Sequence, residues 1–505
     1  MLRVVITGGC GFLGQLLARA ILQRDQLTVH TAEGEVERPL GEIVLADVAA
    51  PPSLLFDELE AARGSKLRVV LGSVADRAFC DRLFEGENVE SISVFHLGSV
   101  MSGQGEADFD LCLNTNLHGT LHMLEAARAC AAVRPRFLFA STMATIGSGE
   151  PADHIKAEDT ITDACRAVSH TTYGMTKAVA ELIMADYSRR HFIDGRGVRL
   201  PTIIVRAGAP NAAVTSCFSG VIREPLAGKP ACMPIGGEVT HAVTGYRAAI
   251  CALVRLHEVP AATADASLGD DRTVFLPSVP VTLAGLAATL SRVVAAEAQP
   301  ALGPVTFEPS ERLSKVVSAM PTATDGHRAL ALGLPPQPSV EQMIREYAED
   351  FPDALAAGVH LTPSPPPPPL YSSCAEAARA HGDGLYVALI TGGGSGIGRA
   401  VALRLSEAWR PSGVESPPEQ PGGGRRGVAV VLTGRRRRPL EETSDACAAL
   451  GVQTMVPRPH SALPWPSARV DSPTPARASS SACLFNAGAA GALSRRCTRP
   501  NDPPS

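Results

Sequence analysis

Several kinds of residue are scarce in this sequence. Aromatic residues make up 4% of the 505 residues, and the formal net charge is −5, so nothing suggests a surface that stacks bases or neutralises phosphates. The twelve cysteines form no Cys-x-x-Cys pair, which predicts neither a zinc site nor a disulfide framework. No run of about 18 apolar residues occurs, and the chain opens on a strand-like stretch rather than a cleavable signal. We therefore expect a cytoplasmic protein with no metal, nucleic-acid or membrane partner.

What is present begins with a strand that runs into a helix through three glycines. Residues 4–7 are apolar or β-branched, the glycines follow at three-residue spacing, and apolar residues recur at helical period over 12–24. In a dinucleotide-binding turn, such glycines permit the tight turn, the approach of backbone N–H groups to a pyrophosphate, and close packing of helix on sheet. The cofactor-binding residues expected here are Gly8, Gly11, Phe12, Leu13 and Gly14.

An acidic residue follows the next buried run, 43–46. At this place Asp47 would accept hydrogen bonds from the adenine ribose and repel a 2′-phosphate, which favours NAD over NADP. It lies nearly twice the usual offset of about 20 residues from the first glycine, so we predict that residues 28–41 form an inserted surface loop. Two alternatives stay open: Glu33 takes this role if Val29 belongs to the second strand, or Asp47 is only a cap.

Further strand-like runs alternate with helical segments. They cover 67–71, 94–99, 136–140 and 198–206. Ser73 follows the first of these runs and is placed to meet the adenine edge, Asn116 is expected to brace a helix, and Thr202 lies near the carboxamide end of the site. The alternation predicts an α/β fold with a doubly wound parallel sheet, the Rossmann arrangement.

A tyrosine and a lysine four residues apart stand at the head of a predicted helix that runs to about Arg190. This spacing places Tyr173 and Lys177 on one helical face, behind Thr142 at a strand end. A phenol ordinarily titrates near pH 10. A nearby ammonium and a positive nicotinamide ring would lower that pKa, so that Tyr173 takes a proton from a substrate alcohol whose oxygen Thr142 holds. The alternative for Tyr173 is an ordinary half-buried helix aromatic.

Residues 206–351 have a different composition from the NAD-binding core at 1–205. Glycine, proline and small polar residues dominate 207–237, which predicts a substrate-capping region, and helical patterns return at 246–259, 281–297 and 339–347. The candidate substrate contacts are Ser102, Arg206, Arg223 and His241. The last three are candidate partners of a carboxylate, with structural salt bridges as the alternative.

A proline-rich linker, 352–384, precedes a second and incomplete unit at 385–455. The signals of this unit are a strand, a glycine-rich turn, a second strand and an arginine cluster, at 385–391, 392–399, 428–434 and 435–438. The arginines would suit the 2′-phosphate of NADP, or else form a solvated basic loop. No tyrosine follows Tyr386, so the unit cannot supply a Tyr/Lys pair. We expect residues 456–505 to be mostly disordered.

Residues 1–350 resemble the extended branch of the short-chain dehydrogenase/reductases, the NAD-dependent epimerase/dehydratase type. The segments that carry the resemblance are 6–14, 45–52, 106–110, 200–206, 210–213 and 222–228. The resemblance implies NAD-dependent oxidation of the C2 hydroxyl of a small sugar acid, D-erythronate, to 2-oxo-tetronate. It also implies that Tyr173 is the general base, that Lys177 is its partner and touches the nicotinamide ribose, and that Thr142 donates a hydroxyl. Homodimers are common in this family.

Two other functions stay open for residues 1–350: a nucleotide-sugar epimerase or dehydratase on the same fold, and a non-catalytic NAD(P)-sensing protein. Residues 385–435 resemble the first third of a single-domain short-chain dehydrogenase, with the rest of that domain lacking. We therefore expect a truncated second segment without activity.

Overall fold

The chain divides into two units, residues 1–363 and 364–505. The computed structural model describes the first unit except for residues 52, 87, 148–154, 157–158, 211–212 and 319. Of the second unit it describes residues 386–391, 428–433, 443 and 453–455.

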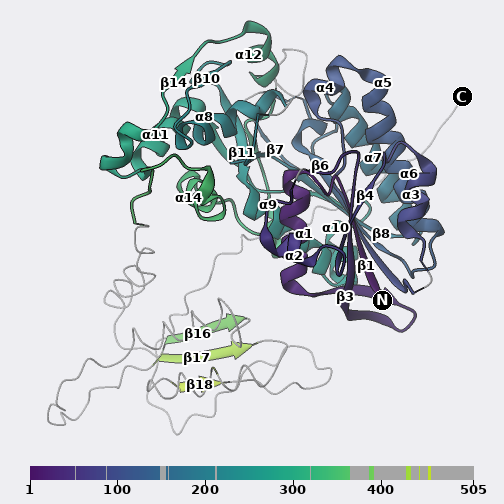
Figure 1. Ribbon diagram of the computed structural model, residues 1–505. Coiled ribbons are helices and arrows are strands. Elements are labelled where there is room, and N and C mark those ends of the chain that lie inside the picture. Colours follow the sequence, from purple (N-terminus) through teal and green to yellow (C-terminus); the bar gives the residue numbers. More distant parts are fainter. Residues whose placement is uncertain are drawn as a thin grey trace, which may run out of the picture. The chain divides into compact units, whose positions relative to one another are not determined.

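An eight-stranded sheet lies at the centre of the first unit (Figure 1). Its strands are β1 (Leu2–Thr7), β2 (Gln26–Thr31), β3 (Gly34–Asp47), β4 (Leu67–Leu71), β5 (Ser91–His96), β6 (Arg136–Thr142), β8 (Asp194–Leu200) and β12 (Thr273–Phe275). The main path runs β12-β8-β6-β5-β1-β3-β2, with β4 beside β3. Every pair is parallel except β2 with β3. The predicted α/β fold with a doubly wound parallel sheet is confirmed.

Alternate residues of the strands contact two different layers of helices. In β1, Val4 and Ile6 belong to one hydrophobic core and Val5 belongs to the other. The first core includes α1 (Phe12–Arg24) and α9 (Tyr246–Glu258), and the second includes α3 (Arg77–Phe84), α6 (Gly119–Ala129) and α7 (Thr172–Arg189). Burial on both faces explains why these strands are almost continuously apolar.

The surface loop predicted for residues 28–41 is wrong. β2 and β3 form an antiparallel hairpin, and β3 then pairs in parallel with β1 as far as Ala46. Residues 32–37 are exposed, so this part of the hairpin lacks the apolar alternation that predicts a strand. Glu33 lies in the exposed turn, where Gly34 takes a φ of +124°.

The single strand predicted over 198–206 is divided at Pro201. β8 ends at Leu200, and β9 (Thr202–Ile204) joins a separate sheet with β11 (Thr240–Gly245) and β13 (Val279–Thr282). Proline has no N–H for a strand ladder, so the chain can change sheets there. The helix predicted at 281–297 is shorter in the structure. Its first two residues belong to β13, and α11 covers Leu283–Val293.

Short helices connect β5 to α6, namely α4 (Ser102–Ala107), α5 (Phe109–Cys112) and a π-helical turn at Leu113–His118. The predicted brace is confirmed, because the Asn116 side chain accepts the Val100 N–H at 2.7 Å and donates to the Val100 carbonyl at 3.0 Å. Beyond β9 lie α8 (Cys217–Leu226), β10 (Ala231–Met233), α10 (Ala261–Leu268), β14 (Val305–Phe307), α12 (Glu311–Ser318) and α14 (Val340–Asp350). Figure 1 shows α8, α11, α12 and α14 grouped together. That this group caps a substrate stays a prediction.

In the second unit, β16 (Tyr386–Thr391), β17 (Val428–Thr433) and β18 (Gln453–Met455) form a parallel sheet. The predicted glycine turn at 392–399, the arginines at 435–438, the linker beyond residue 363 and the tail at 456–505 lie outside the described residues. The predicted domain boundaries therefore stay predictions. Within the described part of the chain, no helix is long and apolar enough to cross a membrane.

At the amino end of β8, the buried carboxylate of Asp194 contacts three arginines and a histidine. Asp194, which is fully buried, accepts hydrogen bonds from Arg196 at 2.6 and 3.1 Å and from Arg272 at 2.7 Å. His30 Nε2 lies 2.9 Å from the same carboxylate, and Arg136 Nε lies 3.6 Å from it. The hydrogen bond with His30 and the charges of the arginines hold the pKa of Asp194 well below its usual value, despite burial.

We predict that Asp194→Asn lowers the free energy of unfolding of the first unit by about 3–5 kcal/mol at pH 7, because three buried arginines lose their shared counter-charge. The folded-state pKa is lowered, so the contribution is present at neutral pH and lost as the pH falls below about 4. Urea unfolding followed by circular dichroism at pH 7 and pH 3 measures both effects. Asp186→Asn is the control, since this exposed carboxylate pairs only with Arg189 and Arg190 among the described residues. If the two variants lose equal free energy of unfolding, Asp194 is not the counter-charge that the buried arginines depend on.

Candidate active site

The glycine bend between β1 and α1 leaves room for nothing larger than hydrogen at Gly8, Gly9 and Gly14, and a Cβ on Gly9 would lie 2.6 Å from the Ile6 carbonyl oxygen. Gly8 has a φ of +65°, and a Cβ there would lie 2.9 Å from Gly98 N. A Cβ on Gly14 would lie 2.4 Å from the Gly8 carbonyl oxygen. Gly11 precedes α1 without a side-chain cap, and the first turn holds no acidic residue. The first amides of the helix therefore suit an anionic group such as a pyrophosphate.

Asp47 closes the other side of this bend. Its Oδ2 accepts the Cys10 N–H at 3.0 Å, and its Oδ1 accepts the Val48 N–H at 2.8 Å. The cap role left open for Asp47 is thus observed. Glu33, the alternative, is exposed in the hairpin turn and does not line the cavity described next. A contact between Asp47 and the ribose stays a prediction.

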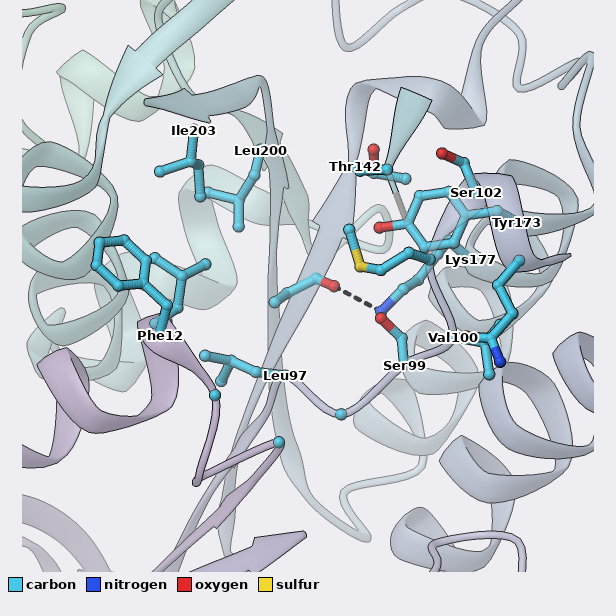
Figure 2. Close-up of a pocket in the computed structure, with 18 of the residues that line it drawn as sticks. Phe12, Leu97, Ser99, Val100, Ser102, Thr142, Tyr173, Lys177, Leu200 and Ile203 are labelled. Atoms are coloured by element: carbon cyan, nitrogen blue, oxygen red, sulfur yellow. Dashed lines mark hydrogen bonds between the residues drawn. The ribbon is translucent and has the colours of Figure 1, made fainter. Parts of the chain in front are cut away.

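A cavity of about 560 Å³ extends from the glycine bend along the carboxyl ends of the strands. The predicted site residues that line it are Gly8, Gly11, Phe12, Leu13, Gly14, Asp47, Ser73, Ser102, Thr142, Tyr173, Lys177, Thr202, Arg206 and His241. Figure 2 shows Thr142, Ser102 and Tyr173 grouped on one wall, with Phe12, Leu200 and Ile203 across from them. The structure therefore brings together residues from the glycine bend, the strand ends and helix α7.

The Tyr173 hydroxyl lies near the hydroxyls of Thr142 and Ser99, and both act to lower its pKa. Thr171 caps α7 through the Gly174 N–H at 3.0 Å, which fixes the first turn that carries Tyr173. Burial raises the pKa of Tyr173 to about 12. The predicted lowering is therefore wrong for these surroundings, because burial outweighs the two hydroxyls and the charge of Arg206. Ser99 was missed from the sequence, and its only signal was its place just after a strand.

Lys177 lies one helical turn further on and is 1% exposed. Its Nζ donates a hydrogen bond to the Ala140 carbonyl at 2.9 Å, the dashed line in Figure 2. It also lies 4.7 Å from the centre of the Phe139 ring. Burial lowers the pKa of Lys177 to about 8, while the Glu181 carboxylate acts to raise it.

Arg206 faces the cavity from the segment after β9. No carboxylate in the described residues lies within ion-pair distance of its guanidinium, although its charge acts on Tyr173. Arg223 is different: it donates to the Arg206 carbonyl at 2.9 Å, pairs with Glu224 at 2.5 Å and does not line the cavity. For Arg223 the structural alternative is the one observed.

His241 lines the cavity but carries no charge near neutral pH. Its Nε2 lies 2.7 Å from Thr202 Oγ1, and its ring stacks on Phe218 with centroids 4.9 Å apart. Burial lowers the pKa of His241 to about 4. It can therefore offer a hydrogen bond but no positive charge to a carboxylate, contrary to the prediction.

A Rossmann sheet with a glycine-rich dinucleotide turn, and with a tyrosine and a lysine four residues apart on one helix, is characteristic of the short-chain dehydrogenase/reductases. A sequence profile described as the NAD dependent epimerase/dehydratase family matches residues 4–245. The chain belongs to this family, the extended branch of that class, and its cofactor is a nicotinamide dinucleotide.

Two relatives match nearly their whole length. The D-erythronate dehydrogenase of Cupriavidus necator is 40% identical over 69% of this chain and 98% of that protein. The D-erythronate dehydrogenase of Haemophilus influenzae is 31% identical over 69% of this chain and 99% of that protein. Among solved structures, a nucleoside-diphosphate-sugar epimerase from Agrobacterium tumefaciens is similar with a TM-score of 0.58 and 28% identity, covering 70% of this chain and 96% of that one.

We predict that Gly14→Ala weakens NADH binding at least about tenfold, equivalent to 1.4 kcal/mol, since a Cβ would press on the Gly8 carbonyl and displace α1 from the bend. Gly236→Ala is the control, because its Cβ would meet only Val239 Cγ2 at 3.9 Å. Isothermal titration calorimetry of both variants with NADH measures the effect. An unchanged dissociation constant in Gly14→Ala would show that the glycine bend does not bind the cofactor.

Proposed function

We propose that the chain is an NAD-dependent dehydrogenase that oxidises the C2 hydroxyl of a small sugar acid, D-erythronate, to 2-oxo-tetronate. The observation that carries this proposal is the cavity-facing Arg206, whose charge reaches Tyr173 and has no carboxylate partner among the described residues. A 2-hydroxy acid supplies that carboxylate beside the reacting alcohol. The two relatives named D-erythronate dehydrogenase support the choice of substrate.

The cofactor would be held by Gly8, Gly11, Phe12, Leu13, Gly14, Asp47, Ser73, Tyr173, Lys177 and Thr202. Amides at the start of α1 suit the pyrophosphate, and the Asp47 carboxylate favours NAD because it would repel a 2′-phosphate. When bound, the nicotinamide supplies the acceptor for the hydride.

The chain's own residues then handle the proton and the orientation of the substrate. Thr142 accepts the Ala144 N–H at 3.1 Å, so its hydroxyl hydrogen is free to point at the alcohol oxygen or at Tyr173. Tyr173 takes the alcohol proton while the Lys177 ammonium beneath it stabilises the phenolate. Arg206 holds the carboxylate, and Ser102 and His241 are the candidate partners of the remaining hydroxyls.

A cytoplasmic location and a homodimer are proposed from the sequence and from the family alone. The epimerase or dehydratase alternative requires that the cofactor be regenerated within the same site, so net formation of reduced cofactor separates the two functions.

The proposal is tested with a panel of three- to six-carbon sugar acids, each assayed with NAD and with NADP. We expect D-erythronate with NAD to give the highest kcat/KM, and absorbance of the reduced cofactor measures it. Turnover with nucleotide sugars but without net NADH would overturn the proposal in favour of the alternative.

Replacing the cation that is assigned to the carboxylate tests the orientation of the substrate. We expect Arg206→Gln to raise KM for D-erythronate about 10- to 100-fold, because a hydrogen-bonded charge contributes about 1.5–3 kcal/mol. KM for NAD should change little. Arg292→Gln, at an exposed arginine of α11, is the matched control. If both variants bind the acid equally well, the carboxylate lies elsewhere.

A further inference from the structure

Glu181 continues the line of reactive side chains on α7. Tyr173, Lys177 and Glu181 follow one another at four-residue spacing, so they share one face of the helix. This face packs against β6 and β8, and Glu181 is only 4% exposed. A carboxylate so deeply buried is costly unless its charge is balanced and hydrogen-bonded.

Both oxygens of Glu181 are held by neighbouring strands. Arg199 from β8 donates through Nε to both oxygens at 3.1 Å, and through Nη2 to Oε2 at 2.7 Å. The Ser141 hydroxyl from β6 donates to Oε1. Arg199 is itself fixed by Asp163 at 3.4 Å and by Asp271 at 3.6 Å. The carboxylate therefore has one orientation, next to the turn that carries Lys177.

Few charged groups face the Lys177 ammonium. His96 on β5 has both ring nitrogens within hydrogen-bond distance of hydroxyls, those of Thr7 and Thr120, and burial lowers its pKa to about 3, so it is neutral. The Cys112 thiol on α5 has its pKa raised by burial and is neutral as well.

Two other acids of the helices packed on α7 have partners away from Lys177. Glu106 on α4 accepts the Thr172 N–H at the start of α7, and Glu125 on α6 bonds to Tyr187 near its end. Of the described groups that act on Lys177, Glu181 is therefore the carboxylate. Burial raises the pKa of Glu181, while the charge and hydrogen bonds of Arg199 and the Ser141 hydroxyl act to lower it and so favour its charged form.

We propose that Glu181 is a positioning residue for the reaction: held by Arg199 and Ser141, its carboxylate keeps Lys177 charged beneath Tyr173. The proposal rests on the proposed function, since Lys177 needs its charge only if Tyr173 acts as a base. Burial opposes the charged form of Lys177, and a helix neighbour of opposite sign offsets that penalty. Without Glu181, the amine would lose its proton within the working pH range, and the phenolate would lose its stabilising charge.

The sequence contains five lysines, at positions 66, 156, 177, 229 and 315. Selective 13Cε labelling of lysine therefore gives few NMR signals in the full chain, and a pH titration reads the pKa of Lys177 without substrate. The Lys177→Arg variant assigns its signal. This readout is independent of which acid the enzyme oxidises, so failure of the proposed function and failure of this inference are distinguishable.

We expect Glu181→Gln to lower the pKa of Lys177 by about one unit or more, which is the range for loss of a neighbouring opposite charge. The pH above which kcat falls should decrease by a similar amount, while KM for NAD changes little. Glu181→Asp keeps the charge one methylene further away and should give an intermediate shift, which tests the proposal even if the glutamine variant does not fold.

Glu125→Gln is the matched control, because it removes a carboxylate that contacts α7 away from Lys177, and it should leave the Lys177 titration where it is. An unchanged Lys177 titration in both Glu181 variants would overturn the proposal. So would a shift in Glu125→Gln as large as that in Glu181→Gln, because the effect would then not come from the Glu181 position.

Discussion

The hydrogen bond from Lys177 Nζ to the Ala140 carbonyl joins helix α7 to the carboxyl end of β6, and the geometry of the site depends on it. Because Thr142 follows two residues after Ala140, the bond sets Tyr173, one turn before Lys177, beside the Thr142 hydroxyl. Burying an ammonium in this way requires a counter-charge and a polarisable neighbour. Glu181 and the Phe139 ring supply them.

A second set of buried contacts ties this pair to the glycine bend. Thr120 donates to the Asn116 carbonyl, so it must accept from His96 Nε2, which leaves Nδ1 to accept the Thr7 hydroxyl. Thr7 Oγ1 in turn accepts the Gly98 N–H, and this seats Gly98 against the bend. The His96 ring stacks on Phe139, whose ring also meets Lys177. One continuous set of buried contacts thus joins the two ends of the cavity.

The sequence was informative where function depends on local spacing. The glycine turn, the Tyr173–Lys177 pair and the apolar strands follow from residues close together in the chain, and the structure brings them to one cavity. The hairpin at residues 26–47 and the change of sheet at Pro201 depend on pairing with distant segments. The raised pKa of Tyr173, the neutral His241 and the salt-bridged Arg223 depend on burial and partners that spacing does not reveal.

Under the proposed function, hydride leaves C2 of the acid while Tyr173 takes the hydroxyl proton. The most direct measurement follows C2-deuterated D-erythronate in the wild type and in Tyr173→Phe. We expect the deuterium to appear in the reduced cofactor, and the variant to transfer it about 10²- to 10⁴-fold more slowly while still binding NAD. Deuterium lost to water, or transfer at the wild-type rate in Tyr173→Phe, would contradict the proposed function.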